Sequence, residues 1–232
     1  MNNRGQPDYA RRKTVRWQPM ELIRVNVLIV YAHPNPRSFN AAMRTVAVDT
    51  LTEAGHAVQV SDLYAMHFKP TLDERDFKER QKPDFFDPLI EQYHAAVSRT
   101  FAEDIAKEVD KVEWANLIIF QFPLWWMSFP AILKGWCDRV FANGVAVNMG
   151  TYDPLFVGKK ALCALTTGSG EAMYAPEGPA QDINVLLTFA RGMFRTAGIE
   201  FLEPFIAFGV PGLTSDERAQ ALQRYRERLQ SL

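Results

Sequence analysis

Cysteine is scarce in this sequence of 232 residues, which contains only Cys137 and Cys163. Neither belongs to a CxxC motif or to a cysteine–histidine pair. Zinc sites and disulfide frameworks need several cysteines at short, regular spacings, so we expect neither a metal site nor a disulfide. The same scarcity is typical of a reducing compartment, and the expected location is cytoplasmic.

An excess of charge of one sign and long apolar runs are missing too. Lysine and arginine total 26 and aspartate and glutamate 27, which gives a formal net charge of -1. Proteins that bind nucleic acids by neutralising phosphates have a positive excess, so this balance argues against a nucleic-acid partner. No run approaches the roughly 20 apolar residues that span a membrane.

The first 24 residues have no apolar pattern and include the basic stretch ARRKTVRWQ. No apolar segment follows its paired arginines, so an export signal is not expected. We expect a poorly ordered tail over residues 1–24. Residues 25–232 contain no repeat and no low-complexity linker, and their number suits one well-buried domain.

Apolar runs alternate with helical patterns throughout this domain. Continuous runs rich in β-branched residues predict buried strands at 25–32, 56–63, 115–122, 160–167 and 199–209. Apolar positions at helical spacing, with caps or glycines at the ends, predict helices at 38–55, 91–112, 130–141, 182–198 and 214–229. A short helix is also expected at 73–80. The alternation predicts an α/β fold with a doubly wound sheet of five strands.

Ligands of such sheets bind at the carboxyl ends of the strands, which selects the loops 33–40, 123–130 and 166–175. The first loop leads into a predicted helix, and the free N–H groups at the start of a helix suit an anion. Ser38, His33 or Arg37 could add further hydrogen-bond donors. No GxGxxG and no Walker lysine motif is present, so neither a Rossmann nor a P-loop site is indicated. Taken alone, Ser38 is more simply a helix cap and His33 an ordinary loop histidine.

The other two loops differ in character. Thr166, Thr167 and the glycines that follow would allow close backbone approach to a polar planar ligand, although a flexible loop without a ligand has the same composition. Trp125 and Trp126 could be core and interface aromatics or the walls of a ligand site. Together, an anion site, an aromatic wall and a loop of small residues predict a flavin site.

Five blocks of the sequence resemble the NAD(P)H:quinone oxidoreductase (DT-diaphorase) family. They are VLIVYAHPNPRSFNAAM, DLYAMHFKP, LIIFQFPLWWMSFPAILKGWCDRVF, LTTGSGEAMY and FLEPFIAFG, and the similarity extends from about Val25 to Leu229. The family has a flavodoxin-like fold with parallel strands in the order 2-1-3-4-5 and helices on both faces. The resemblance implies a homodimer with its active sites at the subunit interface. It also implies an FAD that takes a hydride from NAD(P)H and passes one to a quinone by a ping-pong mechanism.

The resemblance assigns site residues position by position. The residues matching those that hold the FAD phosphates and ribityl chain are His33, Ser38, Phe39 and Asn40. Those matching the loop along the isoalloxazine ring are Pro123, Leu124, Trp126 and Met127. Those matching the second flavin loop are Thr166, Thr167, Gly168 and Ser169. Arg218 aligns with an arginine near the adenosine, and Tyr174 with a tyrosine that stabilises negative charge on the reduced ring.

Several positions depart from the family pattern. Ala180 stands where the animal enzymes have a histidine that assists the tyrosine, so Tyr174 is expected to act as a hydrogen-bond donor without a relay partner. Val147 and Met149 replace two tyrosines of the substrate pocket. Trp125 replaces a polar residue, and the expected substrate pocket consists of Trp125, Val147, Met149 and Tyr174. Trp136, on the apolar face of a helix, is expected in the core. The segment that contacts the adenosine of NAD(P)H in some members has no counterpart, which leaves the donor open.

These features leave more than one function open. The leading interpretation is an FAD-dependent NAD(P)H oxidoreductase that reduces quinones, with nitro and azo compounds as further acceptors. FMN in place of FAD is a variant of it. A regulatory flavoprotein, similar to the ancillary subunits of potassium-efflux systems, is the alternative from a different class, and an α/β protein without a cofactor is the simplest one.

Overall fold

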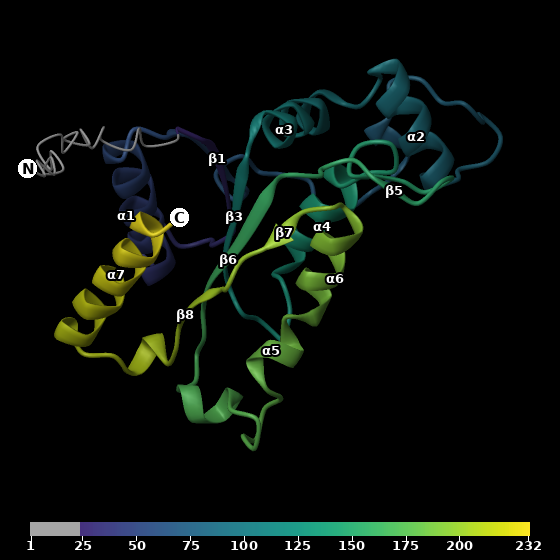
Figure 1. Ribbon diagram of the computed structural model, residues 1–232. Coiled ribbons are helices and arrows are strands. Elements are labelled where there is room, and N and C mark those ends of the chain that lie inside the picture. Colours follow the sequence, from purple (N-terminus) through teal and green to yellow (C-terminus); the bar gives the residue numbers. More distant parts are fainter. Residues whose placement is uncertain (1–23) are drawn as a thin grey trace, which may run out of the picture.

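A computed structural model describes residues 24–232, so all of the predicted tail except Arg24 lies outside the described residues (Figure 1). Its central sheet is parallel and has the order β2-β1-β3-β6-β7, with β8 also paired to β6. The strands are β1 (Asn26–Tyr31), β2 (Ala57–Asp62), β3 (Leu117–Pro123), β6 (Lys160–Thr166), β7 (Glu200–Phe201) and β8 (Phe205–Ala207). Because β7 and β8 share the fifth position beside β6, the predicted five-strand order is confirmed.

Both faces of this sheet are covered by helices, which explains the continuous apolar runs. Leu28 and Val30 of β1 pack into one hydrophobic cluster, whereas Val27 and Ile29 pack into a second cluster on the other face. The helices on the first face are α3 (Glu103–Trp114), α4 (Ala131–Val140) and α6 (Thr188–Thr196). Those on the second are α1 (Phe39–Glu53) and α7 (Ser215–Gln230), which lie together in Figure 1.

The predicted helix over 91–112 is wrong, because two helices occupy this region. The first, α2 (Pro88–Ser98), ends at Arg99 in the left-handed conformation with φ 57°. Phe101 then forms a β-bridge with Phe77, and both rings are buried at a centroid distance of 6.1 Å. Burial of these two aromatic rings therefore draws the chain out of the helix before α3 begins.

Two further elements are shorter than predicted. The helix expected at 182–198 is divided at the buried Leu187 into α5 (Ile183–Leu186) and α6. The strand expected at 199–209 is interrupted before β8 by Pro204, which has no N–H to donate to a neighbouring strand. The remaining short elements are η1 (Glu74–Asp76), inside the helix expected at 73–80, η2 (Glu171–Tyr174), η3 (Val210–Gly212), and the hairpin strands β4 (Val147–Asn148) and β5 (Asp153–Pro154).

Both cysteines are inside the protein. Cys137 lies on α4 and Cys163 on β6, and both thiols are buried and free. Burial raises the pKa of each thiol above its ordinary value. Groups of histidine, cysteine and carboxylate that could hold a metal ion are absent from residues 24–232.

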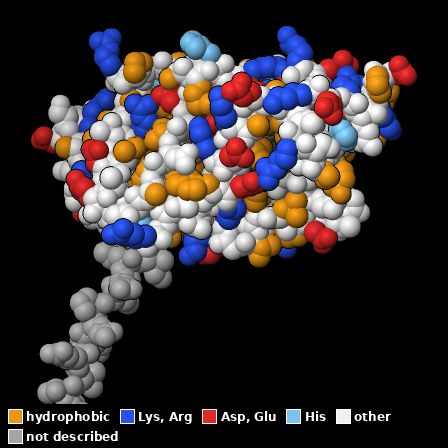
Figure 2. Space-filling model, turned by 90° about the horizontal axis from the view of Figure 1, so that it is seen from above, with side chains coloured by type: hydrophobic (Ala, Val, Ile, Leu, Met, Phe, Trp, Pro, Cys, Tyr) orange, Lys and Arg blue, Asp and Glu red, His pale blue; other side chains and the backbone are white. Residues whose placement is uncertain are grey.

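The face of the molecule shown in Figure 2 has no concentration of one charge. Figure 2 shows lysine and arginine side chains interspersed with aspartate and glutamate over one face of the molecule. Within residues 24–232, no helix combines the length and the apolar character that a membrane span requires.

Candidate functional site

A crevice of about 420 Å³ lies at the carboxyl ends of β1, β3 and β6. The parallel register places the end of each strand beside the next, with Tyr31 opposite Gln121 and Pro123 opposite Thr166. The three loops predicted from the sequence therefore meet here. The lining residues are His33, Ser38, Phe39, Asn40, Pro123, Leu124, Trp125, Trp126, Met127, Thr166, Thr167, Gly168, Tyr174, Val210 and Pro211.

The first wall of the crevice is the N-terminus of α1. Ser38 caps this helix, because its hydroxyl accepts a hydrogen bond from the Ala41 N–H at 3.1 Å. The N–H groups of Phe39 and Asn40 have no acceptor among the described residues. Free N–H groups at the positive end of a 15-residue helix make this wall suitable for an anion such as a phosphate.

The side chain of Asn40 lies behind this helix end and is almost fully buried. Its Nδ2 donates to Thr166 Oγ1 at 2.6 Å, and its backbone oxygen accepts from Gln121 Nε2 at 2.5 Å. Its Oδ1 is buried without a hydrogen-bond partner in residues 24–232. An unpaired buried acceptor costs roughly 1–3 kcal/mol, and a ligand hydroxyl donating to Oδ1 would recover that free energy.

The second wall is the loop after β3, which has an unusual backbone. Trp126 and Met127 have φ angles of 47° and 61°, so two consecutive residues other than glycine are left-handed. The loop is held in place because Leu124 N–H donates to the Thr166 oxygen at 2.8 Å and Ser128 N–H to the Trp125 oxygen at 3.1 Å. The N–H groups of Trp126 and Met127 have no acceptor within the described chain, so both can serve a ligand.

The two adjacent tryptophans occupy different surroundings. The Trp125 ring lies 6.1 Å from the His33 ring, tilted by 54°, and is 42% exposed. Within residues 24–232, Trp126 has no such ring contact, and it is 97% exposed. Trp136 is fully buried and edge-on to Phe120, which confirms the prediction that it belongs to the core.

His33 is oriented by its own loop. Its Nδ1 accepts the Asn35 N–H at 3.0 Å, so the neutral ring has its proton on Nε2. Burial lowers the pKa of His33 below 6.5, and the hydrogen bond to Asn35 only partly opposes this effect. His33 is therefore a neutral donor at pH 7.

The third wall is the loop after β6. Thr167 Oγ1 donates to the Ser169 oxygen at 2.7 Å, and Gly209 N–H donates to the same oxygen at 2.8 Å. A Cβ added at Gly168 would meet nothing within 4 Å, so the backbone there is open to close approach. Val210 and Pro211 were missed by the sequence analysis, although the rule on strand ends also applies to the loop after the fifth strand.

Tyr174, the last residue of η2, also lines the crevice. Its ring is buried and lies 6.0 Å from Phe208 at an interplanar angle of 33°. The hydroxyl has no hydrogen-bond partner among the described residues. Ala180 lies behind the same short helix and donates its N–H to the Met173 oxygen at 2.9 Å, and its methyl group offers no proton to Tyr174.

Four predicted residues do not line the crevice of the single chain. Arg218 donates instead to the backbone oxygens of Leu213 and Val210 at 3.0 and 2.9 Å, which holds the loop that contains Val210 and Pro211. The other three residues outside the crevice are Ser169, Val147 and Met149. The roles assigned to all four residues stay predictions.

Comparison with known proteins agrees with the fold. Residues 25–230 match the family model described as flavodoxin-like fold. A ribosyldihydronicotinamide dehydrogenase (quinone) from Mus musculus is 42% identical over 210 residues, which cover 89% of this chain and 91% of the relative. NAD(P)H dehydrogenase (quinone) 1 from Cavia porcellus is 40% identical over 213 residues, which cover 88% of this chain and 76% of the relative.

A solved structure gives the same result. A candidate quinone reductase from Klebsiella pneumoniae superposes with a TM-score of 0.85 at 38% identity, covering 89% of this chain and 84% of that chain. The similarities in sequence and in fold thus extend over nearly the same residues and confirm the resemblance inferred from the five sequence blocks. The chain belongs to the NAD(P)H:quinone oxidoreductase family of the flavodoxin-like fold.

Proposed function

We propose that this protein is an FAD-dependent NAD(P)H oxidoreductase that reduces quinones by hydride transfer. The main support is one crevice in which the free N-terminus of α1 faces the left-handed pair Trp126–Met127. A flavin needs both: an anion site for its phosphate, and backbone donors beside its ring. The volume of about 420 Å³ lies within the roughly 300–1,000 Å³ of small-molecule sites.

Each wall has a part in holding the cofactor. The amides of Phe39 and Asn40, with Ser38 and the neutral His33, would bind phosphate, and the unpaired Asn40 Oδ1 would accept a ribityl hydroxyl. The ring would lie along the loop after β3 and the open backbone at Gly168. The residues assigned to the ring are Pro123, Leu124, Trp126, Met127, Thr166, Thr167, Gly168 and Ser169. Arg218 would hold the loop at the adenosine end.

Bound flavin supplies the reversible hydride chemistry that side chains lack. Tyr174 would donate its hydroxyl hydrogen bond to the side of the ring where negative charge accumulates. In a site that excludes water, one such donor stabilises developing charge by about 3 kcal/mol. The side chain of Ala180 offers no proton to Tyr174. Tyr174 would therefore donate its hydrogen bond without a second residue that supplies it with a proton.

A single crevice favours sequential use by the two substrates. The reduced nicotinamide would bind first and leave, and the quinone would then bind in its place, which is ping-pong behaviour. Trp125, Val147 and Met149 would make the pocket apolar, which suits quinones and also nitro and azo compounds.

A homodimer is part of the proposal. Trp126 is 97% exposed beside the crevice, and Tyr152 and Val157 of the described chain are also largely exposed. Large exposed apolar side chains are typical of surfaces that a partner covers. A second copy over the crevice would exclude water from the ring.

Purification with flavin analysis and kinetics tests this function. We expect an absorbance band at about 450 nm, release of FAD on denaturation, and steady reduction of a simple benzoquinone by NADH or NADPH with parallel double-reciprocal plots. No band, even after addition of FAD, would refute the flavin site. Bound flavin with negligible turnover would instead favour the alternative of an ancillary subunit of a potassium-efflux system.

A further inference from the structure

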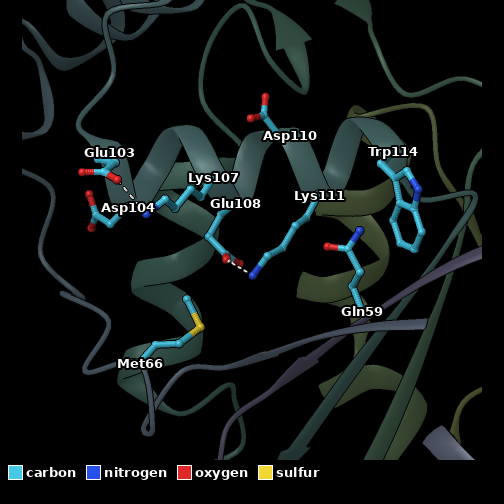
Figure 3. A pocket seen from close by; sticks show the side chains of 9 residues that line it. All are labelled: Gln59, Met66, Glu103, Asp104, Lys107, Glu108, Asp110, Lys111 and Trp114. Carbon is cyan, nitrogen blue, oxygen red and sulfur yellow. Dashed lines mark hydrogen bonds and ion pairs between the residues drawn. The ribbon is translucent and has the colours of Figure 1, made fainter. Parts of the chain in front are cut away.

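A groove of about 880 Å³ lies between α3, β2 and the turn after β2, and it shares no residue with the crevice at the strand ends. Its volume is within the roughly 300–1,000 Å³ of small-molecule sites. Figure 3 shows Gln59 and Trp114 at one end of the groove and Met66 facing α3 from the opposite side. The full lining is Gln59, Met66, Glu103, Asp104, Lys107, Glu108, Asp110, Lys111 and Trp114.

Every charged side chain of the groove already has a partner of opposite sign. The pairs are Glu103–Lys107, Asp104–Arg139, Glu108–Lys111 and Asp110–Arg99, with nitrogen–oxygen distances of 2.7, 2.8, 2.6 and 3.8 Å. A charged ligand would therefore meet a like charge beside every opposite one, and the repulsion would offset the attraction. The groove thus favours an uncharged occupant.

One of these pairs belongs to a buried hydrogen-bond network. Glu108 is fully buried, and its two oxygens accept hydrogen bonds from Trp136 Nε1 at 2.8 Å and from Lys111 Nζ at 2.6 Å. Lys111 Nζ also donates to Ser61 Oγ at 3.0 Å. An ammonium group has three N–H donors, so Lys111 keeps one without an acceptor in residues 24–232. Because Lys111 lines the groove, this donor is available to a ligand.

The Trp114 end of the groove adds flat apolar surface and further donors. Figure 3 shows the Gln59 amide directed toward α3 beside the Trp114 ring, and neither side chain is joined to another lining residue. Met66, 41% exposed, adds an apolar contact, and the methylene stem of Lys111 adds another. Lys111 and Trp114 are three residues apart on α3, about 4.5 Å along its axis. One bicyclic ring system can therefore reach both side chains.

We propose that this groove is a second small-molecule site, which binds an uncharged aromatic compound that carries oxygen acceptors. The ring of the compound would lie against Trp114 and Met66. Its carbonyl oxygen would accept the free N–H of Lys111, and a second oxygen would accept from the Gln59 amide. The paired charges would exclude anions and cations of the same shape. This inference is independent of the flavin site.

An NMR titration of the full-length protein with chromone tests the site. Chromone is an uncharged bicyclic aromatic compound with a carbonyl oxygen and a ring oxygen. We expect saturable shifts of the indole N–H signals of Trp114 and Trp136, since the Glu108 that holds Trp136 also binds Lys111. Phenylalanine variants of the other four tryptophans assign the signals, and Trp136 is the fifth. No saturable shift up to about 1 mM, or shifts confined to Trp125 and Trp126 of the crevice, would overturn the proposal.

Matched variants and a charged analogue test the assigned contacts. Gln59→Met removes the amide at similar length and should weaken chromone binding about fivefold, the effect expected for one hydrogen bond. The control Gln220→Met changes an exposed glutamine on α7 and should leave binding unchanged. Chromone-2-carboxylate should bind more weakly than chromone, because Glu108 and Asp110 would repel it. Equal binding by the two glutamine variants, or tighter binding of the carboxylate, would overturn the proposal.

Discussion

At the scale of single residues, the site depends on groups that the fold leaves without partners. Asn40 Oδ1 is buried and has no hydrogen-bond partner in the described chain. Tyr174 lines the crevice, and its hydroxyl has no partner in the same residues. The sequence identified both residues, because each lies in a block that resembles the family. It could not show what Trp125 contacts, since the ring reaches His33 across about ninety positions of sequence.

Tyr174→Phe should lower the rate of hydride transfer about 100-fold and leave FAD bound. The variant loses the hydroxyl donor but keeps the ring that packs on Phe208. Stopped-flow reduction by NADH measures the rate, and flavin content measures binding. The control Tyr152→Phe removes the hydroxyl of an exposed tyrosine and should change neither. Loss of FAD from the Tyr174 variant would show that the tyrosine is structural.

Trp125→Gln should raise the pKa of His33 toward 6.5. The indole covers one side of the imidazole, and burial is the main cause of the lowered pKa of His33. Titration of the histidine resonances in the apoprotein measures the shift. Trp126→Gln, a matched change at the neighbouring position, should leave the pKa of His33 as it is. Equal shifts in both variants would contradict this assignment.

At the scale of elements, the sequence predicts the strands and the helix starts well because their signals are local. The continuous apolar run at β3 and the serine cap of α1 each lie within a few residues. The breaks at Arg99 and Leu187 depend on side chains buried by distant segments, so a local pattern of apolar residues extends through them. The left-handed pair in the loop after β3 contains no glycine and no asparagine, and its conformation has no local signal at all.

The backbone at Met127 gives a prediction about stability. Met127→Gly should preserve more free energy of unfolding than Met127→Val, by about 1–2 kcal/mol, because only glycine is unstrained at a φ of 61°. Denaturant titration of the apoprotein measures the difference. Met66 is similarly exposed and does not have a positive φ, so valine should be tolerated better than glycine there. If the same variant, glycine or valine, were the more stable one at both positions, the result would contradict strain in the loop.

At the scale of the whole molecule, two hydrophobic clusters enclose the sheet, and the site lies where three strands end together. The composition of the chain and the alternation of elements were sufficient to predict this arrangement. They were not sufficient to predict how much apolar surface remains beside the crevice, because exposure depends on the final packing. Trp126, which is 97% exposed, is one example.

A dimer that covers this surface should make stability depend on protein concentration. The melting temperature should rise with concentration, because association favours the folded state by mass action. Sedimentation should give a mass near twice the 26.4 kDa of the chain. A single-chain mass over the whole concentration range, with an unchanged melting temperature, would contradict the proposed homodimer.

The burial of the two cysteines has a chemical consequence for a quinone reductase. Quinones are electrophiles that form covalent adducts with exposed thiolates. Cys137 on α4 and Cys163 on β6 are shielded from solvent, and burial keeps both thiols protonated by raising each pKa. The chain has no other cysteine. The protein would thus handle a thiol-reactive substrate without offering it a nucleophilic sulfur, and its own catalysis would not inactivate it by arylation.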